Sequence, residues 1–176
     1  MKKFELTSET KVVLGRTLHR IRALISFGDV EAGSLGGWIE KEENLDHSGK
    51  AWVSGNARVY GDARVYGDAW VYGDAWVYGN AQVFGNAQVC GNAQVFGIGA
   101  IFWISAIGSR NGTVTFFACQ DGKIRAAAGC FFGDLDDFEK KIQATHGENV
   151  HAKVYRLAIE MAKERIRVPE DAEAEK

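Results

Sequence analysis

The chain of 176 residues has little of several residue types that mark particular classes of protein. It has one proline and three cysteines, and Cys90, Cys119 and Cys130 are odd in number and lack the spacing of a metal site. We therefore expect reduced thiols and a cytoplasmic protein rather than a disulfide-bonded secreted one. No apolar run approaches the roughly 20 residues that cross a bilayer, and the first residues lack the apolar core of a secretory signal, so we expect no membrane association. The net charge of −2 likewise gives no general attraction to nucleic acid.

The chain does have a tandem repeat with a period of six, from Ala51 to Phe96. Each copy reads alanine, a variable residue, valine, a second variable residue, and glycine followed by Asp or Asn. Alanine and valine point to the same side of an extended segment, and the Gly-Asx pair supplies a turn. Three turns close a triangular coil of about 18 residues, and successive coils stack as parallel strands. The predicted inner columns are Val53, Val71 and Val89; Val59, Val77 and Val95; and Val65, Val83 and Ile101.

This hexad resembles the hexapeptide repeat of left-handed β-helix proteins. Seven consecutive copies make the resemblance specific for the fold. It implies that the fold class is mainly β, with a left-handed parallel β-helix at its centre. A flat β-meander or a different solenoid is the alternative.

The segments that flank the repeat divide the chain further. Asp121-Gly122, between two alternating runs, is typical of a β-hairpin. Asp134 and Asn149 are expected to cap two helices at their N-termini, and Gly147 is expected to end the first helix. These signals predict a small C-terminal α+β domain made of a β-hairpin and two helices. The predicted parts are residues 1–34 for N-terminal strands and a cap, 35–107 for the β-helix, 108–168 for the C-terminal domain and 169–176 for an acidic tail.

A second resemblance lies outside the repeat. The segment from Ile21 to Ile39, with its pattern of Asp29-Val30, Ala32-Gly33 and Gly36-Gly37-Trp38, is similar to the opening of bacterial and prophage-encoded hexapeptide-repeat proteins of unassigned function. The segments 107–110, 129–131 and 145–151 resemble the tail domain of the same proteins. The resemblance implies a phage or prophage accessory protein, located in the host cell cytoplasm if phage-encoded, and it implies no known chemistry.

The outward positions of the repeat are rich in aromatic residues. Exposed aromatic patches of this size are rare on monomers, so we predict a homo-oligomer, either a dimer or a trimer. Its interface is predicted to include Tyr60, Tyr66, Trp70, Tyr72, Trp76 and Tyr78. The alternative is that these rings stabilise the sheet faces or are covered by the terminal segments.

Catalytic groups are scarce in this sequence. Hexapeptide β-helices often belong to acyltransferases that use a histidine base, yet no histidine lies within the repeat and no long loop interrupts it. His47, near the first coil, is expected to be a surface residue. No nucleophile elbow or phosphate loop is present. We therefore predict no enzymatic activity and no cofactor, with an acyltransferase or a Cys130–His146 nucleophile pair as weaker alternatives.

Metal binding is also disfavoured. His146 and His151 are five residues apart and, together with Cys130, could bind zinc. We favour the interpretation that His146 interacts with the C-terminal end of a helix and that His151 lies near the start of the next helix. No metal site is therefore predicted.

With catalysis and metal binding disfavoured, ligand binding is the function that the sequence favours. The polar stretch from Gly108 to Gly112 lies where the predicted β-helix meets the C-terminal domain, and Arg110 offers a planar donor fork suited to phosphate or carboxylate. The alternative is that this stretch is only a turn. The predicted ligand-binding residues are Ser109, Arg110, Phe131, His146, Asn149 and His151.

These observations together favour a non-enzymatic, phage-type accessory protein. We expect it to act in counter-defence, either by sequestering a small anionic, nucleotide-like ligand or by masking a host protein. A structural or polymer-forming solenoid scaffold is the alternative.

Overall fold

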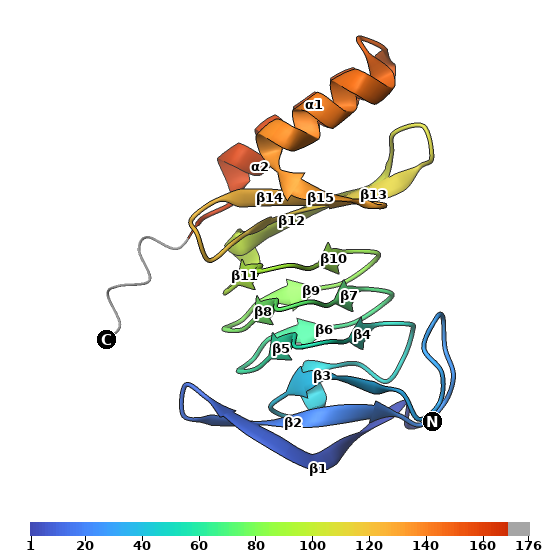
Figure 1. Cartoon of the computed structure of the whole chain (residues 1–176), viewed down its shortest axis with the longest axis vertical. Coiled ribbons are helices and arrows are strands. Elements are labelled where there is room, and N and C mark those ends of the chain that lie inside the picture. The colour runs from blue at the N-terminus through green and yellow to red at the C-terminus, as the bar shows by residue number, and fades with distance from the viewer. Residues whose placement is uncertain (169–176) are drawn as a thin grey trace. The chain divides into compact units, whose positions relative to one another are not determined.

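The computed structural model describes residues 1–168, and the acidic tail predicted for residues 169–176 lies outside these described residues. The chain forms two compact units, Met1–Ile98 and a second unit that begins at Gly99. The first unit contains an N-terminal hairpin and the coils of the repeat, and the second contains a β-sheet with two helices (Figure 1).

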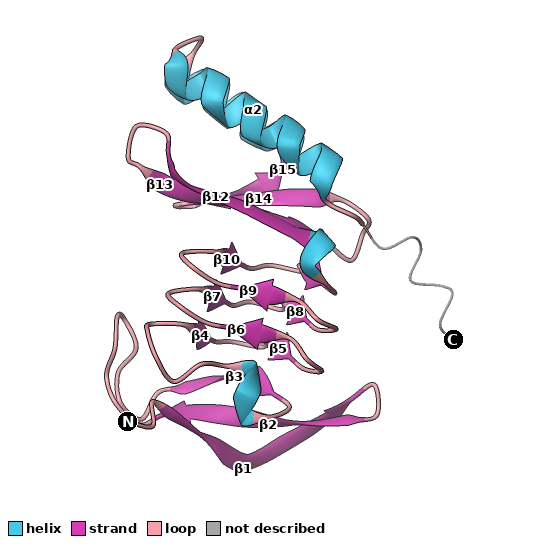
Figure 2. Ribbon diagram, turned by 180° about the vertical axis from the view of Figure 1, so that it is seen from behind, coloured by secondary structure: helices cyan, strands magenta, loops and turns pink. Residues whose placement is uncertain are grey.

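The repeat forms a β-solenoid, which confirms the predicted fold. Its strands are two residues long: β4 (Trp52–Val53), β5 (Arg58–Val59), β6 (Arg64–Val65), β7 (Trp70–Val71), β8 (Trp76–Val77), β9 (Gln82–Val83), β10 (Gln88–Val89) and β11 (Gln94–Val95). Strands three apart in the chain pair in parallel, so that Val53 lies beside Val71 and Val59 beside Val77. This pairing gives three faces, β4-β7-β10, β5-β8-β11 and β6-β9, and the last of these is seen best from behind (Figure 2).

The narrow interior explains the strictness of the repeat. The repeat valines are fully buried, and the alanines that precede them are buried as well. At the turns the glycines are required for two reasons. Gly73 has a φ of +72°, and a Cβ at this position would lie 3.0 Å from the backbone nitrogen of Gly91 in the next coil. Any larger residue here would therefore strain its own backbone and separate the coils.

The N-terminal residues extend one face of the solenoid into a larger sheet. β1 (Phe4–Val13) and β2 (Arg16–Ala23) form an antiparallel hairpin, and β2 pairs with β3 (Leu35–Ile39). Ile39 of β3 lies beside Val59 in parallel register, so β3 pairs with the first strand of this face of the repeat. The sheet order is β1-β2-β3-β5-β8-β11. β1 is one strand with an irregularity between Leu6 and Thr10.

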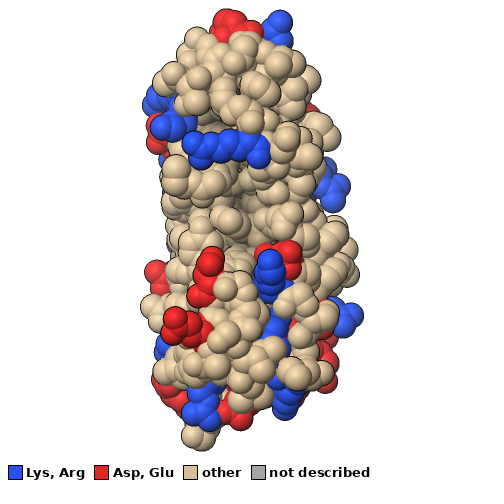
Figure 3. Space-filling view, turned by 90° about the vertical axis from the view of Figure 1, so that its right-hand side faces the viewer, with Lys and Arg blue, Asp and Glu red and all other residues tan. Residues whose placement is uncertain are grey.

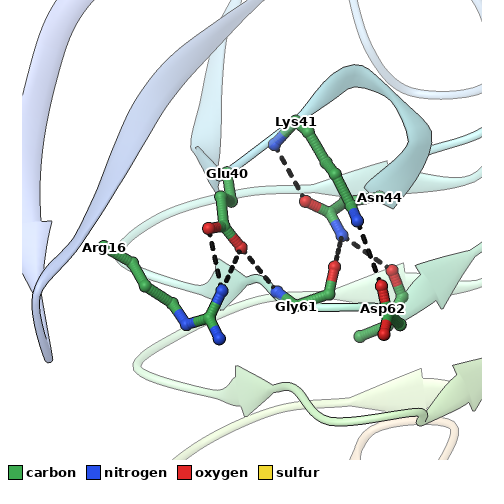
Figure 4. A network of polar contacts seen from close by, with 7 residues as sticks. Arg16, Glu40, Lys41, Asn44, Gly61 and Asp62 are labelled. Atoms are coloured by element: carbon green, nitrogen blue, oxygen red, sulfur yellow. Dashed lines mark hydrogen bonds and ion pairs between the residues drawn. The ribbon is translucent and has the colours of Figure 1, made fainter.

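The irregular first corner of the solenoid is held by a buried asparagine (Figure 4). Asn44, which is 0% exposed, donates through Nδ2 to the carbonyl oxygens of Gly61 at 3.1 Å and Ala63 at 2.8 Å. Its Oδ1 accepts a hydrogen bond from the backbone nitrogen of Lys41 at 3.0 Å. Beside it, Glu40 accepts from the backbone nitrogen of Gly61 at 2.7 Å. Side chains thus replace the Gly-Asx turn that this corner lacks.

A buried lysine caps the start of the first coil. Lys3 is 1% exposed, and its Nζ donates to the carbonyl oxygen of Ala51 at 2.9 Å and, at longer distance, to two neighbouring carbonyls. Burial lowers the pKa of Lys3 to about 8. The expectation that His47 is a surface residue is wrong, because its ring is half-buried and stacks on Phe4 with centroids 4.2 Å apart. His47 Nε2 also lies 2.6 Å from a carboxylate oxygen of Glu42.

The solenoid ends earlier than the sequence suggested. After β11 the chain passes through a short 3-10 helix (Ile98–Ala100) into β12 (Ile101–Ile107), which pairs with an antiparallel strand of the second unit. Ile101 lies beside Phe117 in that sheet, so its placement in the third inner column was wrong. The boundary falls after Ile98 rather than after residue 107. The physical reason is that Ile98 replaces the Asx residue of the turn, so the next corner cannot form.

The second unit is a four-stranded antiparallel sheet covered on one face by two helices (Figure 1). Its strands are in sequential order, and its helices pack on each other and on the sheet. After β12 come β13 (Gly112–Ala118), β14 (Ile124–Ala128), β15 (Phe131–Asp134), α1 (Leu135–His146) and α2 (Val150–Arg165). The predicted hairpin and both helices are confirmed, whereas β12 and β15 were not predicted as strands of this sheet.

The helix caps agree with the sequence. Asp134 accepts a hydrogen bond from the backbone nitrogen of Asp137 at 2.9 Å, and Asn149 accepts from that of His151 at 2.9 Å. Gly147, with a φ of +54°, ends α1. None of the helices in residues 1–168 is long and apolar enough to cross a membrane.

We predict that Asn44→Ala lowers the free energy of unfolding by about 3 kcal/mol, because two carbonyls and one backbone N–H at the first corner lose their partner. Asn56→Ala is the matched control, since the exposed side chain of Asn56 donates to Asp74 at the long distance of 3.3 Å. Urea denaturation of both variants measures the difference. Equal stability of the two variants would show that the corner does not depend on Asn44.

Candidate functional site

Several predicted ligand-binding residues gather around a tyrosine of the second unit. Arg110 lies in the exposed turn between β12 and β13, and the neighbouring Gly108 lies so close to Tyr155 of α2 that a Cβ there would overlap the Tyr155 hydroxyl. Tyr155 stacks on His146 with ring centroids 5.7 Å apart, and His146 lies 5.6 Å from His151. Burial raises the pKa of Tyr155, and the charge of Arg110 opposes this rise.

The other predicted residues of this site have different surroundings. Phe131 is half-buried and packs on Phe138 at 4.9 Å, so it contributes to the interior of the unit. The Asn149 side chain is occupied in capping α2, and Ser109 is exposed in the turn. Sequence analysis missed Tyr155, although its position four residues after His151 in a helix places both side chains on one face.

The structure revises the predicted oligomer interface. Tyr60 is only 5% exposed and packs with Leu18 and Trp38 beneath the N-terminal hairpin, so its placement at an interface between copies was wrong. Tyr78 stacks on Tyr60 at 5.2 Å, and Trp76 also packs against this cluster. For Tyr60 and the residues packed with it, the alternative interpretation therefore applies: a terminal segment covers these rings.

The remaining interface residues are half-buried. Tyr66 stacks on Phe84 with centroids 4.9 Å apart, while Trp70 and Tyr72 lie on the β4-β7-β10 face. The homo-oligomer itself stays a prediction.

A different constellation lies on the outer face of the six-stranded sheet, within the first unit. Arg20 of β2, Trp38 of β3, Arg58 of β5 and Trp76 of β8 are neighbours in register, and they form a row across four strands. Lys11 of β1 lies over this row. We call Lys11, Arg20 and Arg58 the cationic cluster.

The cationic cluster is organised by the tryptophans. The Nζ of Lys11 lies 4.1 Å from the ring centroid of Trp38, and the guanidinium of Arg20 lies 5.2 Å from the same ring. The guanidinium of Arg58 lies 4.8 Å from the ring of Trp76. Each cation thus has an aromatic face beside it, which offsets part of the cost of its burial.

The cations of the cluster oppose one another. Burial is the main cause that lowers the pKa of Lys11 to about 8, and the charges of Arg58 and Arg20 act in the same direction. Asp74 and Glu9 partly offset this effect, and Glu9 lies 3.8 Å from Arg20. The three cations of the cluster are therefore accompanied by only two nearby carboxylates, so the half-buried cluster has an excess of positive charge.

Four buried polar groups at this site have no hydrogen-bond partner in the described part of the chain. They are the Trp38 indole nitrogen, the Tyr60 hydroxyl and the Nε atoms of Arg20 and Arg58. Trp38 is 6% exposed, and burial raises the pKa of Tyr60 to about 12, so both groups keep their protons at neutral pH. Each buried donor without an acceptor costs about 1–3 kcal/mol, which makes four at one place unusual.

Metal ligands do not gather in a comparable way. Within residues 1–168, no group of three His, Cys, Asp or Glu side chains is placed to hold a metal ion. Cys130 is exposed at the turn between β14 and β15.

The comparison with known families bears on the solenoid. A family model described as the YdcK beta solenoid repeat matches residues 51–67, 57–73 and 63–79. The chain is a β-solenoid repeat protein. The matches overlap and lie within the coils that contain β4 to β8, so they describe the scaffold rather than the hairpin or the second unit. No curated protein matches the chain.

We predict that Gly108→Ala destabilises the second unit by more than about 1 kcal/mol, because the added methyl group overlaps the Tyr155 hydroxyl and Gly108 has a φ of +74°. Gly112→Ala is the control, since a Cβ at Gly112 meets no atom within 4 Å. Thermal unfolding of the two variants tests this. Parallel loss of stability in both would mean that the contact with Tyr155 is not responsible.

Proposed function

We propose that this β-solenoid protein is a non-enzymatic binding protein that captures a small anionic ligand at the cationic cluster. The observation that carries the proposal is the coincidence of three cations with four buried donors that have no acceptor in the described chain. An anion with several oxygen atoms supplies both the missing negative charge and the missing acceptors. A neutral or cationic ligand would not relieve the mutual repulsion of Lys11, Arg20 and Arg58.

A binding role suits these groups better than catalysis. The Trp38 indole does not titrate, and the pKa of Tyr60 is raised to about 12. Groups that keep one protonation state hold a ligand but do not perform acid–base catalysis near neutral pH. Lys11, with its pKa lowered to about 8, titrates near neutral pH. A bound anion beside Lys11 would raise this pKa.

Phosphate-bearing ligands fit this set of donors best. Guanidinium groups pair with phosphate oxygens in a bidentate manner, and the half-buried Trp76 and Tyr78 lie beside Arg58 and Tyr60, where a nucleobase could stack. The ligand class predicted from the sequence, a small nucleotide-like anion, is thus retained, while its site moves from Arg110 to the hairpin. A protein that sequesters a nucleotide signal lowers its free concentration, which is how the phage-type counter-defence role would operate.

The decisive test removes one donor without disturbing the fold. Tyr60→Phe deletes only a hydroxyl that has no partner in the described chain, so we expect an unchanged or higher melting temperature together with about fivefold weaker binding of sulfate. Arg58→Gln should weaken binding by about tenfold or more, because a charge-assisted contact is lost. Arg64→Gln is the matched control, since Arg64 has the same place in its hexad but lies exposed in β6.

The titration is followed through the indole N–H resonances in nuclear magnetic resonance spectra, where Trp38 reports directly on the site. ADP is titrated in parallel, and tighter binding of ADP than of sulfate supports a nucleotide-like ligand. Sulfate binding that is equally strong in the parent, Arg58→Gln and Arg64→Gln proteins would refute the proposal.

The pKa of Lys11 gives an independent prediction. Sulfate keeps its double negative charge from about pH 7 to about pH 9, and Tyr60, with its pKa raised to about 12, keeps its proton over the same interval. Lys11, whose pKa is lowered to about 8, loses its positive charge as the pH rises through that value. Sulfate affinity should therefore fall between these two pH values, and Lys11→Met should abolish that fall. An affinity that rises with pH would contradict the placement of Lys11 at the site.

A further inference from the structure

A separate groove lies on another face of the first unit, formed by the β4-β7-β10 sheet and the loop that follows β2. It has a volume of about 490 Å³, and its lining includes Asp29, Ser54, Asp68, Trp70, Asn86 and Gln88. This volume is within the range of small-molecule sites. Figure 3 shows the side on which β4, β7 and β10 lie in Figure 1; acidic and basic side chains gather over its lower half, and the surface above them consists mostly of other residues.

The repeat places these residues in a regular grid. Along one coil the outward positions are Asp68, Trp70 and Tyr72, because alternate residues of an extended segment point to the same side. Eighteen residues further on, in the next coil, Gln88 lies beside Trp70 in parallel register. The indole is therefore at the centre, with polar side chains before it, after it and in the adjacent coil.

Trp70 differs from the other tryptophans of this unit. Trp38 and Trp76 have guanidinium groups over their rings, and Trp52, one coil before Trp70, is 2% exposed beneath the edge of Phe27 at 5.4 Å. Trp70 is half-buried, and within residues 1–168 its ring has no aromatic ring or cation beside it. The loop thus covers one indole of the column and leaves the next one open to the groove.

The polar groups around Trp70 are suited to hydroxyl groups. Asp29 and Asp68 accept hydrogen bonds, although Asp68 Oδ1 already accepts one from the backbone nitrogen of Lys50 at 3.0 Å. Asn86, Gln88 and Ser54 have groups that both donate and accept. A sugar ring has a C–H face that packs on an indole and a rim of hydroxyls that both donate and accept. A central aromatic platform with a mixed polar rim matches that pattern.

Other ligand classes fit the groove less well. Asp29 and Asp68 would repel an anion, and the lining has no Lys or Arg among its residues. An organic cation is held best by several aromatic faces that surround the charge, whereas here one indole is open. The second aromatic residue, Tyr72, is engaged by a hydrogen bond between its hydroxyl and Cys90.

We propose that this groove is a second binding site, which takes a neutral saccharide with one sugar ring stacked on Trp70 and its hydroxyls bonded to Asp29, Asp68 and Asn86. The site is independent of the cationic cluster, since it lies on a different sheet and shares no residue with it. The protein would then bind two unlike ligands through two faces of one scaffold.

The test uses Trp70→Gln, a substitution that the repeat itself tolerates. Glutamine occupies the same hexad position in Gln82, Gln88 and Gln94, so the variant should keep the coil intact. The probes are maltotriose, cellotriose and chitotriose, observed by saturation-transfer nuclear magnetic resonance on the full chain. We expect at least one of them to bind the parent protein, and Trp70→Gln to weaken that binding by about tenfold. Asp29→Asn should weaken it as well, whereas the exposed Gln82→Ala, on a different face, should not.

Two controls separate this site from alternatives. Sulfate binding should be unchanged in Trp70→Gln, so that failure of this site and failure of the cationic cluster can be told apart. Light scattering is measured on the parent and on Trp70→Gln.

Three outcomes would overturn the proposal. The first is no binding of any of the three trisaccharides. The second is binding of tetramethylammonium that depends on Trp70, which would indicate a cation site. The third is a parent dimer that dissociates in the variant, which would assign this face to self-association.

Discussion

The structure depends on one constraint, the stacking of each coil on the next around an interior of small and branched apolar side chains, which are valine and alanine in the repeat and include Ile39 and Leu45 in the first coil. Backbone hydrogen bonds join strands three apart, and the turn glycines let adjacent coils approach closely. The inward positions of the repeat are all taken by these apolar residues. Chemical variety is therefore confined to the outward positions, and any function of this unit has to lie on its faces or at its ends.

The N-terminal segment covers two faces of the solenoid in different ways, and this makes their surfaces chemically different. On the sheet that continues into β3, β2 and β1, the hairpin covers Tyr60 and Trp38 and brings Lys11 and Arg20 beside Arg58. On the β4-β7-β10 face, the loop carrying Phe27 covers Trp52 but leaves Trp70 open. One non-repetitive segment thus turns two similar faces of a regular solenoid into two chemically distinct surfaces, one with a cluster of cations and one with an indole among carboxylate and amide side chains.

The cationic cluster also has an energetic consequence. Bringing Lys11, Arg20 and Arg58 together out of water works against folding, and the aromatic rings beside them offset only part of that cost. The buried donors of Trp38 and Tyr60 add to it. The repeated backbone pairing of the coils acts in the opposite direction, because each coil is hydrogen-bonded to its neighbours along the solenoid. In the second unit, by contrast, the predicted residues around Tyr155 are largely used in packing and capping.

The sequence by itself determined the solenoid, the register of its valines and the caps of both helices, because these depend on short-range periodicity and on single residues such as Asp134, Asn149 and Gly147. It placed the end of the solenoid too late, since Ile98 interrupts the turn while the apolar pattern continues into Ile101. Only the tertiary structure decided which aromatic residues are covered and where the cations meet. Lys11 and Arg58 are 47 positions apart in the sequence and come together because an antiparallel hairpin folds onto a parallel sheet. No local pattern encodes that contact, because it depends on how far the hairpin reaches across the face of the solenoid.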